Sequence, residues 1–280
     1  MPAIHAQAPA DDALSGVGLH SENTMQIQGS KWLVTGGASG MGKHFTLQLA
    51  REGADVAFCD LNEEGIQAVI AEGADLPGKV VGFSCNVADS ESVNKLVADA
   101  AAALGGLNGI VNNAGILRDG LLVKKDRKTG ALKVMSDKAW QAVMDVNLTG
   151  VFNGARAFAE YHVANNAGQE AVIVSISSIS RHGNMGQTNY SAAKAGIVAM
   201  TKLWAGELAR YGVRTGCIAP GFVRTPILEA MKPEILEKVT KPVPLRRLGE
   251  PQEIFLGVKF IAENGYFTGR CLDIDGGLVL

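Results

Sequence analysis

The 280-residue sequence has few cysteines, and they are far apart along the chain. The four are Cys59, Cys85, Cys217 and Cys271, and no two of them form a CxxC pair. The sequence therefore offers neither a zinc template nor a redox motif of that kind, and we expect no metal site. Because three of the four lie inside apolar runs, we expect buried free thiols in a reducing compartment, which favours the cytoplasm.

The sequence also lacks an excess of charge and a long hydrophobic run. Its formal net charge is -2, which gives no overall attraction to nucleic acid or to an anionic membrane. The apolar stretch 192–209 is interrupted by Lys194, Lys202 and Glu207, so we expect no membrane span. The first 30 residues contain no Lys or Arg and no continuous apolar core, unlike a secretory or mitochondrial presequence. We interpret 1–26 as a flexible extension and 27–280 as one folded domain.

Short apolar runs alternate with longer helical patterns from Lys31 onward. Seven runs read as strands: 31–34, 55–58, 79–83, 107–111, 171–176, 213–218 and 270–274. Helical patterns cover 41–52, 63–72, 89–104, 137–165, 189–211 and 250–264. Nearly continuous hydrophobicity is typical of strands that are covered on both faces. The alternation predicts an α/β fold: a single-domain, Rossmann-type, doubly wound, seven-stranded parallel sheet with helices on both faces and ligands bound beyond the carboxyl ends of its strands.

A glycine-rich turn, TGGASGMG at 35–42, connects the first predicted strand to the first helix. Gly36, Gly40 and Gly42 leave backbone N–H groups and a positive helix start free for a phosphate. Asp60 ends the second strand, 18 residues after Gly42, where a carboxylate accepts hydrogen bonds from an adenosine ribose. The carboxylate repels a 2'-phosphate, and the nearby Ser39 and Leu61 supply no cation, so NAD is favoured over NADP. A helix cap or turn residue is the alternative role for Asp60.

Tyr190 and Lys194 stand four residues apart in NYSAAKAG, so both lie on one helix face. A tyrosine ordinarily loses its proton near pH 10, and a neighbouring ammonium group lowers that pKa. Ordinary packing is the alternative explanation of such a pair. Ser177 lies 13 residues before Tyr190 at the end of a strand, where its hydroxyl would hold a substrate oxygen near the phenol. Ser178 is its rival, and the spacing favours Ser177.

With NNAG at 112–115, Asn147 in DVNLTG and PGFVRT at 220–225, the sequence resembles the short-chain dehydrogenase/reductase family, classical type, across 27–280. The resemblance implies that Tyr190 is the general acid/base. It implies that Lys194 lowers the pKa of Tyr190 and holds the nicotinamide ribose. Ser177 would orient the substrate oxygen, and Asn147 would position a water in a proton relay.

The resemblance also implies a set of cofactor contacts at the strand ends. They are Gly36, Ser39, Gly40, Met41, Gly42, Asp60, Leu61, Asn86, Val87, Asn113, Ala114, Gly115, Tyr190, Lys194, Pro220, Gly221, Val223 and Thr225. Asn113 to Gly115 would line the adenosine side, and the last four would hold the nicotinamide. Asn86 stands where the family often has Asp, and its carbonyl still accepts a hydrogen bond from adenine. The family further implies a homotetramer that uses the long helices around 145–165 and 189–211.

The segment between NNAG and Asn147 is longer than in a minimal member and is rich in cations. Lys124, Lys125, Arg127, Lys128 and Lys133 surround Asp126. Such a loop would attract a phosphate- or carboxylate-bearing substrate, and a solvated hairpin around Thr129 and Gly130 is the alternative. His182 is either substrate-facing or incidental. Apolar wall candidates are Met185, Phe222, Leu228 and Met231, and 225–241 resembles the family's mobile substrate loop.

The expected function is NAD-dependent interconversion of a secondary alcohol and a ketone, with a small-molecule substrate and no nucleic-acid or membrane partner. A 3-hydroxyacyl or 3-oxoacyl thioester is the leading substrate. A cyclic alcohol, a hydroxysteroid or a polyol is the alternative. A dinucleotide-sensing protein without turnover is a second alternative, although it would need none of the four catalytic candidates. An epimerase or dehydratase of the related extended fold is less favoured, because the glycine spacing is not GxxGxxG.

Overall fold

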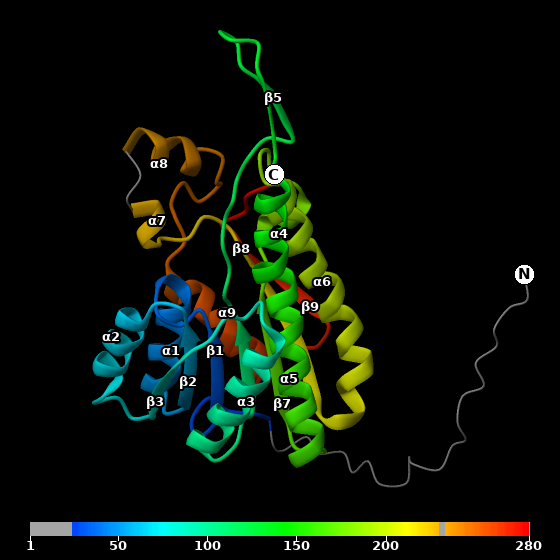
Figure 1. Cartoon of the computed structure of the whole chain (residues 1–280). Coiled ribbons are helices and arrows are strands. Elements are labelled where there is room, and N and C mark those ends of the chain that lie inside the picture. The colour runs from blue at the N-terminus through cyan, green and yellow to red at the C-terminus, as the bar shows by residue number, and fades with distance from the viewer. Residues whose placement is uncertain (1–23, 230–232, 280) are drawn as a thin grey trace, which may run out of the picture.

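The computed structural model describes residues 24–229 and 233–279, and a parallel sheet forms its centre (Figure 1). The seven strands are β1 (Lys31–Thr35), β2 (Asp55–Asp60), β3 (Val80–Ser84), β4 (Gly109–Asn112), β7 (Ala171–Ile176), β8 (Val213–Pro220) and β9 (Arg270–Ile274). Their spatial order is β3-β2-β1-β4-β7-β8-β9, and every neighbouring pair is parallel. The order in which successive strands join the sheet reverses between β1 and β4, and such a switch point is where doubly wound sheets bind ligands. The predicted fold class is confirmed.

Helices cover both faces of this sheet. One face carries α1 (Gly40–Arg51), α2 (Glu63–Gly73) and α9 (Pro251–Glu263), and the other carries α3 (Ser90–Leu104), α5 (Gly150–Asn165) and α6 (Thr188–Leu208). Strand β1 shows why the predicted strands read as continuous apolar runs. Trp32 and Val34 pack against Phe45 of α1, whereas Leu33 between them packs on the opposite face with Phe158 of α5. Burial on both sides thus replaces the polar–apolar alternation of a one-sided sheet.

Several helix starts are encoded locally. The Asn62 side chain accepts a hydrogen bond from the backbone of Gly65 at the start of α2, and Asp89 does the same for Glu91 at the start of α3. Such caps satisfy backbone N–H groups that have no partner inside the helix. At the other end of α3, Gly105 adopts φ +70°, a left-handed conformation that ends the helix cleanly.

The structure divides one predicted helix, shows the hairpin that was named as an alternative, and forms two helices in a third segment. The region predicted as one helix over 137–165 contains α4 (Asp137–Met144), a π-helical turn (Asp145–Thr149) and α5. The cationic segment forms an antiparallel hairpin, β5 (Val123–Lys125) with β6 (Leu132–Val134), which projects from the body (Figure 1). The 225–241 segment contains α7 (Pro226–Glu229) and α8 (Pro233–Thr240).

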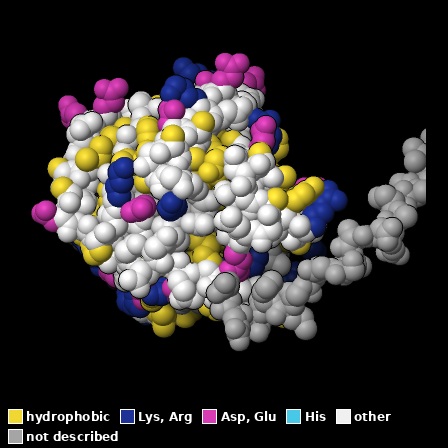
Figure 2. Space-filling model, turned by 90° about the horizontal axis from the view of Figure 1, so that it is seen from below, with side chains coloured by type: hydrophobic (Ala, Val, Ile, Leu, Met, Phe, Trp, Pro, Cys, Tyr) yellow, Lys and Arg dark blue, Asp and Glu magenta, His cyan; other side chains and the backbone are white. Residues whose placement is uncertain are grey.

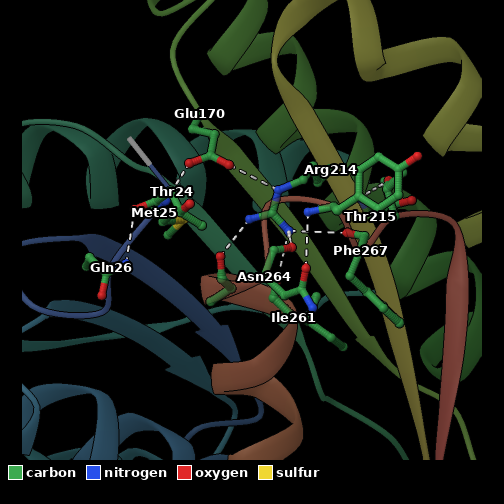
Figure 3. A network of polar contacts seen from close by, with 12 residues as sticks. Thr24, Met25, Gln26, Glu170, Arg214, Thr215, Ile261, Asn264 and Phe267 are labelled. Carbon is green, nitrogen blue, oxygen red and sulfur yellow. Dashed lines mark hydrogen bonds and ion pairs between the residues drawn. The ribbon is translucent and has the colours of Figure 1, made fainter. Parts of the chain in front are cut away.

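A buried arginine ties the start of the described chain to the sheet and to the end of α9 (Figure 3). The Arg214 guanidinium lies 3.2 Å from Glu170 and donates to the carbonyls of Ile261 and Ala262, both at 2.6 Å. Glu170 in turn accepts from the backbone N–H of Met25, whose side chain is buried. Met25, two residues before Ile27, therefore packs with the domain although it was assigned to the extension. Residues 1–23 of the expected extension lie outside the described residues.

The molecular surface agrees with the near-balanced net charge. Figure 2 shows the lower face with acidic and basic side chains interspersed among apolar ones, without a field of one sign. In the described residues, no helix has both the length and the apolar character needed to cross a membrane.

Candidate active site

Two neighbouring pockets lie at the carboxyl ends of the sheet strands. The first, of about 220 Å³, lies at the ends of β1, β2 and β3 and is here called the adenosine-side pocket. The second, of about 410 Å³, lies at the ends of β4, β7 and β8 and is here called the central pocket. Gly115 and Ile116 line both, so one elongated ligand can extend through the two.

Of the three predicted glycines of the turn, Gly36 and Gly42 have no room for a side chain, and the same holds for Gly37, where a Cβ would lie 2.6 Å from the Cβ of Phe58. Gly36 has φ +66°, and a Cβ there would lie 2.9 Å from the Cα of Ala114. A Cβ on Gly42 would lie 2.0 Å from the carbonyl oxygen of Gly36. The Asn113 side chain closes the turn by donating to the carbonyls of Thr35 and Gly36 at 3.1 and 3.2 Å.

Gly40 differs from the other two glycines, because its φ is +52° while a Cβ there would meet nothing closer than 4.0 Å. The space above the start of α1 is therefore open. A backbone without side chains at a positive helix end suits the phosphates of a dinucleotide.

The adenosine-side pocket gathers most of the residues predicted to contact that half of a cofactor. They are Gly36, Ser39, Asp60, Leu61, Asn86, Val87, Ala114 and Gly115. Asp60 is fixed by backbone groups: one carboxylate oxygen accepts from Leu61 and Asn62 at 2.8 and 3.1 Å, and the other accepts from Ala38 at 3.1 Å. Asp60 thus has the turn role named as its alternative and also borders the pocket. Among the described residues that line this pocket, none is Lys or Arg.

The central pocket gathers the predicted catalytic tyrosine and lysine. Their companions from the predicted set are Met41, Asn113, Gly115, Ser177, Pro220, Gly221, Val223 and Thr225. Tyr190 and Lys194 are one turn apart on α6, and the Lys194 Nζ lies 5.4 Å from the centre of the Tyr190 ring. That Nζ donates a 2.7 Å hydrogen bond to the carbonyl of Ile176 at the end of β7. The last residue of one strand therefore sets the position of the buried ammonium group.

Burial dominates the ionisation of both groups. It raises the pKa of Tyr190 to about 12, while the Ser178 hydroxyl acts in the opposite direction. It lowers the pKa of Lys194 to about 8. We expected Lys194 to lower the pKa of Tyr190, but in this structure the net change for the phenol is upward. The ammonium group is hydrogen-bonded to a backbone carbonyl, and removal of the phenol from water is the larger effect.

The two serines after β7 point to different partners. The Ser177 hydroxyl donates to the carbonyl of Lys194 at 2.8 Å and is almost fully buried. The Ser178 side chain interacts with Tyr190. Both line the central pocket, yet the structure brings the second serine, not the favoured Ser177, to the phenol. Both hydroxyls reach α6, Ser177 at the Lys194 carbonyl and Ser178 at the Tyr190 phenol, and the 13-residue spacing alone does not specify which of them meets the phenol.

Asn147 lies in the π-helical turn between α4 and α5 and is fully buried. Its side chain accepts from the Ile116 N–H at 2.8 Å and donates to the Ile116 carbonyl at 3.0 Å. It is not among the residues lining the central pocket, and neither are Gly40 and Gly42. The π turn places Asn147 directly behind Ile116, which lines both pockets.

A polar rim that was not predicted covers the mouth above Tyr190. Gln187 donates to Asp119 at 3.0 Å and accepts from Ser180 at 2.9 Å and Asn184 at 3.0 Å. The Asp119 charge contributes to the raised pKa of Tyr190. No motif marks these residues in the sequence, because their partnership depends on two loops that meet only in the fold.

Two of the four apolar wall candidates line the central pocket, namely Phe222 and Leu228. Met185 is 89% exposed and His182 is also exposed, while Met231 lies outside the described residues. None of the described hairpin residues lines either pocket. In the described part of the chain, no group of three or more His, Cys, Asp and Glu is arranged to hold a metal ion.

Comparisons with known proteins agree with this geometry. Residues 36–279 match the family model described as enoyl-(acyl carrier protein) reductase. The chain is 40% identical to 3-oxoacyl-(acyl-carrier-protein) reductase of Thermotoga maritima, over 91% of this chain and 100% of the relative. It is 34% identical to (3R)-3-hydroxyacyl-CoA dehydrogenase of Rattus norvegicus, over 91% and 98%. A crystal structure of a short-chain type dehydrogenase/reductase from Mycobacterium marinum superimposes with TM-score 0.80 at 30% identity, over 90% and 96%.

Proposed function

The chain belongs to the short-chain dehydrogenase/reductase family of oxidoreductases, and we propose that it is an NAD-dependent enzyme interconverting a secondary alcohol and a ketone. The observation that carries the proposal is the meeting of Tyr190, Lys194 and Ser178 in one pocket next to the glycine turn. A general acid/base, a buried cation and a hydroxyl are the groups that proton transfer at a carbonyl oxygen requires.

NAD is the proposed cofactor. The open backbone at Gly40 would receive the pyrophosphate, and Asp60 would accept hydrogen bonds from the adenosine ribose. A 2'-phosphate would face the Asp60 carboxylate, and the described lining residues offer no cation to offset that repulsion. When bound, the nicotinamide ring supplies or accepts the hydride.

The protein's own residues would supply the proton and the orientation. In ketone reduction, Tyr190 donates its phenolic proton to the carbonyl oxygen while the Ser178 hydroxyl donates a hydrogen bond to the same atom. In alcohol oxidation, the phenolate takes the proton back. Lys194 stabilises the phenolate by its charge, and its amine would also hold the nicotinamide ribose. The Asn147 side chain, bonded to Ile116, would position a water behind Lys194 and so connect the buried proton to solvent.

A 3-hydroxyacyl or 3-oxoacyl thioester is the proposed substrate. The names of two relatives specify 3-oxoacyl and 3-hydroxyacyl groups carried on acyl carrier protein and on CoA. The central pocket supports an acyl chain, because Leu117, Phe222, Leu228 and Val239 add apolar walls beside Tyr190.

We also propose a cytoplasmic homotetramer. Phe152 on α5 is 39% exposed and Leu203 on α6 is 60% exposed, on two helices that lie side by side in Figure 1. Exposed apolar side chains on adjacent helices are typical of a surface that a second copy covers. Light scattering of the purified protein would report the mass of the assembly.

Turnover assays test the function directly. Purified protein is mixed with NADH or NADPH and acetoacetyl-CoA, and in the reverse direction with NAD and 3-hydroxybutyryl-CoA, while nicotinamide absorbance is followed. We expect turnover in both directions with a preference for NADH. Tight NADH binding without turnover of thioesters, hydroxysteroids, cyclic alcohols or polyols would instead support the dinucleotide-sensing alternative.

A further inference from the structure

All four cysteines meet in pairs, although the sequence separates them. Cys217 on β8 and Cys271 on β9 are direct register partners. Cys59 is the next-to-last residue of β2. Cys85 directly follows β3, which is the strand paired with β2. In each pair the partner thiol is the largest influence on the pKa of both sulfurs.

Only the Cys59–Cys85 pair belongs to the adenosine-side pocket. Both residues line it, and they adjoin Asp60 and Asn86, which are the proposed contacts to the ribose and the adenine. Within the described part of the chain, Cys217 and Cys271 line neither pocket of the site. The molecule therefore contains one thiol pair at the cofactor site and one matched pair away from it.

The surroundings of Cys85 favour its thiolate. Its sulfur accepts a hydrogen bond from the Ser92 hydroxyl at 3.3 Å and lies beside the Cys59 thiol, at the ends of two paired strands. The interaction with Cys59 is the largest influence, and with the Ser92 hydrogen bond it outweighs burial and the Asp89 charge, so the pKa of Cys85 falls to about 7. The interaction with Cys85 raises the pKa of Cys59. One sulfur of the pair is thus a nucleophile and the other is a protonated neighbour.

We propose that Cys59 and Cys85 form an oxidation-sensitive dithiol, which a hydroperoxide converts to a disulfide in the protein without bound dinucleotide, and that this disulfide weakens cofactor binding. The Cys85 thiolate attacks the peroxide, the O–O bond breaks, and a sulfenic acid and one water (or alcohol) form. Cys59 then attacks the sulfenic sulfur, the S–O bond breaks, and a second water leaves. The two thiols lose two electrons and two protons, and the peroxide is reduced by the same two electrons.

The effect on binding follows from the neighbours of the two sulfurs, and it rests on the proposed cofactor site. Closing the disulfide draws the ends of β2 and β3 together next to Asp60 and Asn86. Loss of one hydrogen bond to a charged acceptor corresponds to a decrease in affinity of about tenfold or more. Bound NAD fills the pocket and shields both sulfurs, so the cofactor protects the site that oxidation would damage.

The test oxidises the full-length protein with hydrogen peroxide, with and without saturating NADH, and maps disulfides by mass spectrometry. NADH affinity is measured before oxidation, after oxidation and after reduction with dithiothreitol. We expect a Cys59–Cys85 peptide, less of it when NADH is present, and a reversible decrease in NADH affinity of about tenfold or more. The variants Cys85→Ser and Cys85→Ala should lose the disulfide, and the matched double variant Cys217→Ser/Cys271→Ser should respond as the unchanged protein does.

Absence of the Cys59–Cys85 peptide, or equal amounts with and without NADH, would overturn the proposal. So would a mapped disulfide that leaves NADH affinity unchanged. If the reduced protein bound no NADH at all, the proposed function would fail instead, and disulfide mapping would still report on the thiol pair independently.

Discussion

Replacing Ser177 and Ser178 in turn shows which of the two hydroxyls orients the substrate oxygen, a choice that the sequence alone could not make. The Ser178 side chain interacts with Tyr190, whereas the Ser177 hydroxyl donates to the Lys194 carbonyl at 2.8 Å. If Ser178 donates to the oxygen that gains charge during reduction, Ser178→Ala should lower kcat by about 10²–10³, the usual effect of removing one such donor.

Ser177→Ala should act on stability instead. It removes one buried hydrogen bond, which costs about 1 kcal/mol of unfolding free energy. Because the lost partner is the backbone carbonyl of Lys194 and not its amine, kcat should fall by less than about tenfold. The serine variants differ by one position in the same segment, so each is the matched control for the other.

Steady-state reduction of acetoacetyl-CoA and urea unfolding together measure both effects. Removing Ser178 also removes the group that lowers the pKa of Tyr190, so the tyrosine limb of the pH–rate profile should move to higher pH in Ser178→Ala. The reasoning is refuted if Ser177→Ala loses activity by a hundredfold while Ser178→Ala remains near normal.

Other substitutions test the remaining parts of the site. Asp60→Ala should weaken NADH binding by about tenfold and reduce the ratio of NADH affinity to NADPH affinity, as measured by titration with both cofactors. Lys194→Met should abolish turnover and stabilise the fold at pH 7 by about 3 kcal/mol, because burial lowers the lysine pKa from 10.5 to about 8. The buried lysine destabilises the fold fully below pH 8 and no longer does so above its unfolded pKa of 10.5. Urea titrations should therefore show that the extra stability of Lys194→Met becomes smaller as pH rises. Asp119→Asn should move the tyrosine limb of the pH–rate profile to lower pH, since the Asp119 charge raises that pKa. Gly42→Ala should cost about 1–3 kcal/mol in urea unfolding, because its Cβ would lie 2.0 Å from the Gly36 carbonyl.

The parts of the fold that local chemistry determines were predictable. Strands such as β1 are buried on both faces, and that burial leaves a continuous apolar run in the sequence. The glycine turn was also predictable, since contacts such as that between Gly42 and the Gly36 carbonyl exclude any side chain. The Tyr190–Lys194 pair follows from helical periodicity alone.

Two kinds of feature were not predictable: the direction in which a side chain points, and contacts between segments that are distant in the sequence. The spacing that favoured Ser177 counts residues but does not say which hydroxyl meets the Tyr190 phenol and which meets the Lys194 carbonyl. The expected decrease in the pKa of Tyr190 rested on the nearby ammonium group alone, whereas burial raises that pKa. The contact of Gln187 with Asp119 and that of Cys59 with Cys85 join segments that only the sheet order brings together.

The proton-transfer role of Tyr190 is the central claim, and Tyr190→Phe tests it most directly. The substitution removes one oxygen atom and leaves the ring, the Lys194 contact and the adenosine-side pocket in place. NADH binding and acetoacetyl-CoA turnover are measured on the same preparation. We expect kcat to fall by about 10³ or more while NADH affinity changes by less than about threefold. Turnover by the phenylalanine variant at the rate of the unchanged protein would contradict the claim.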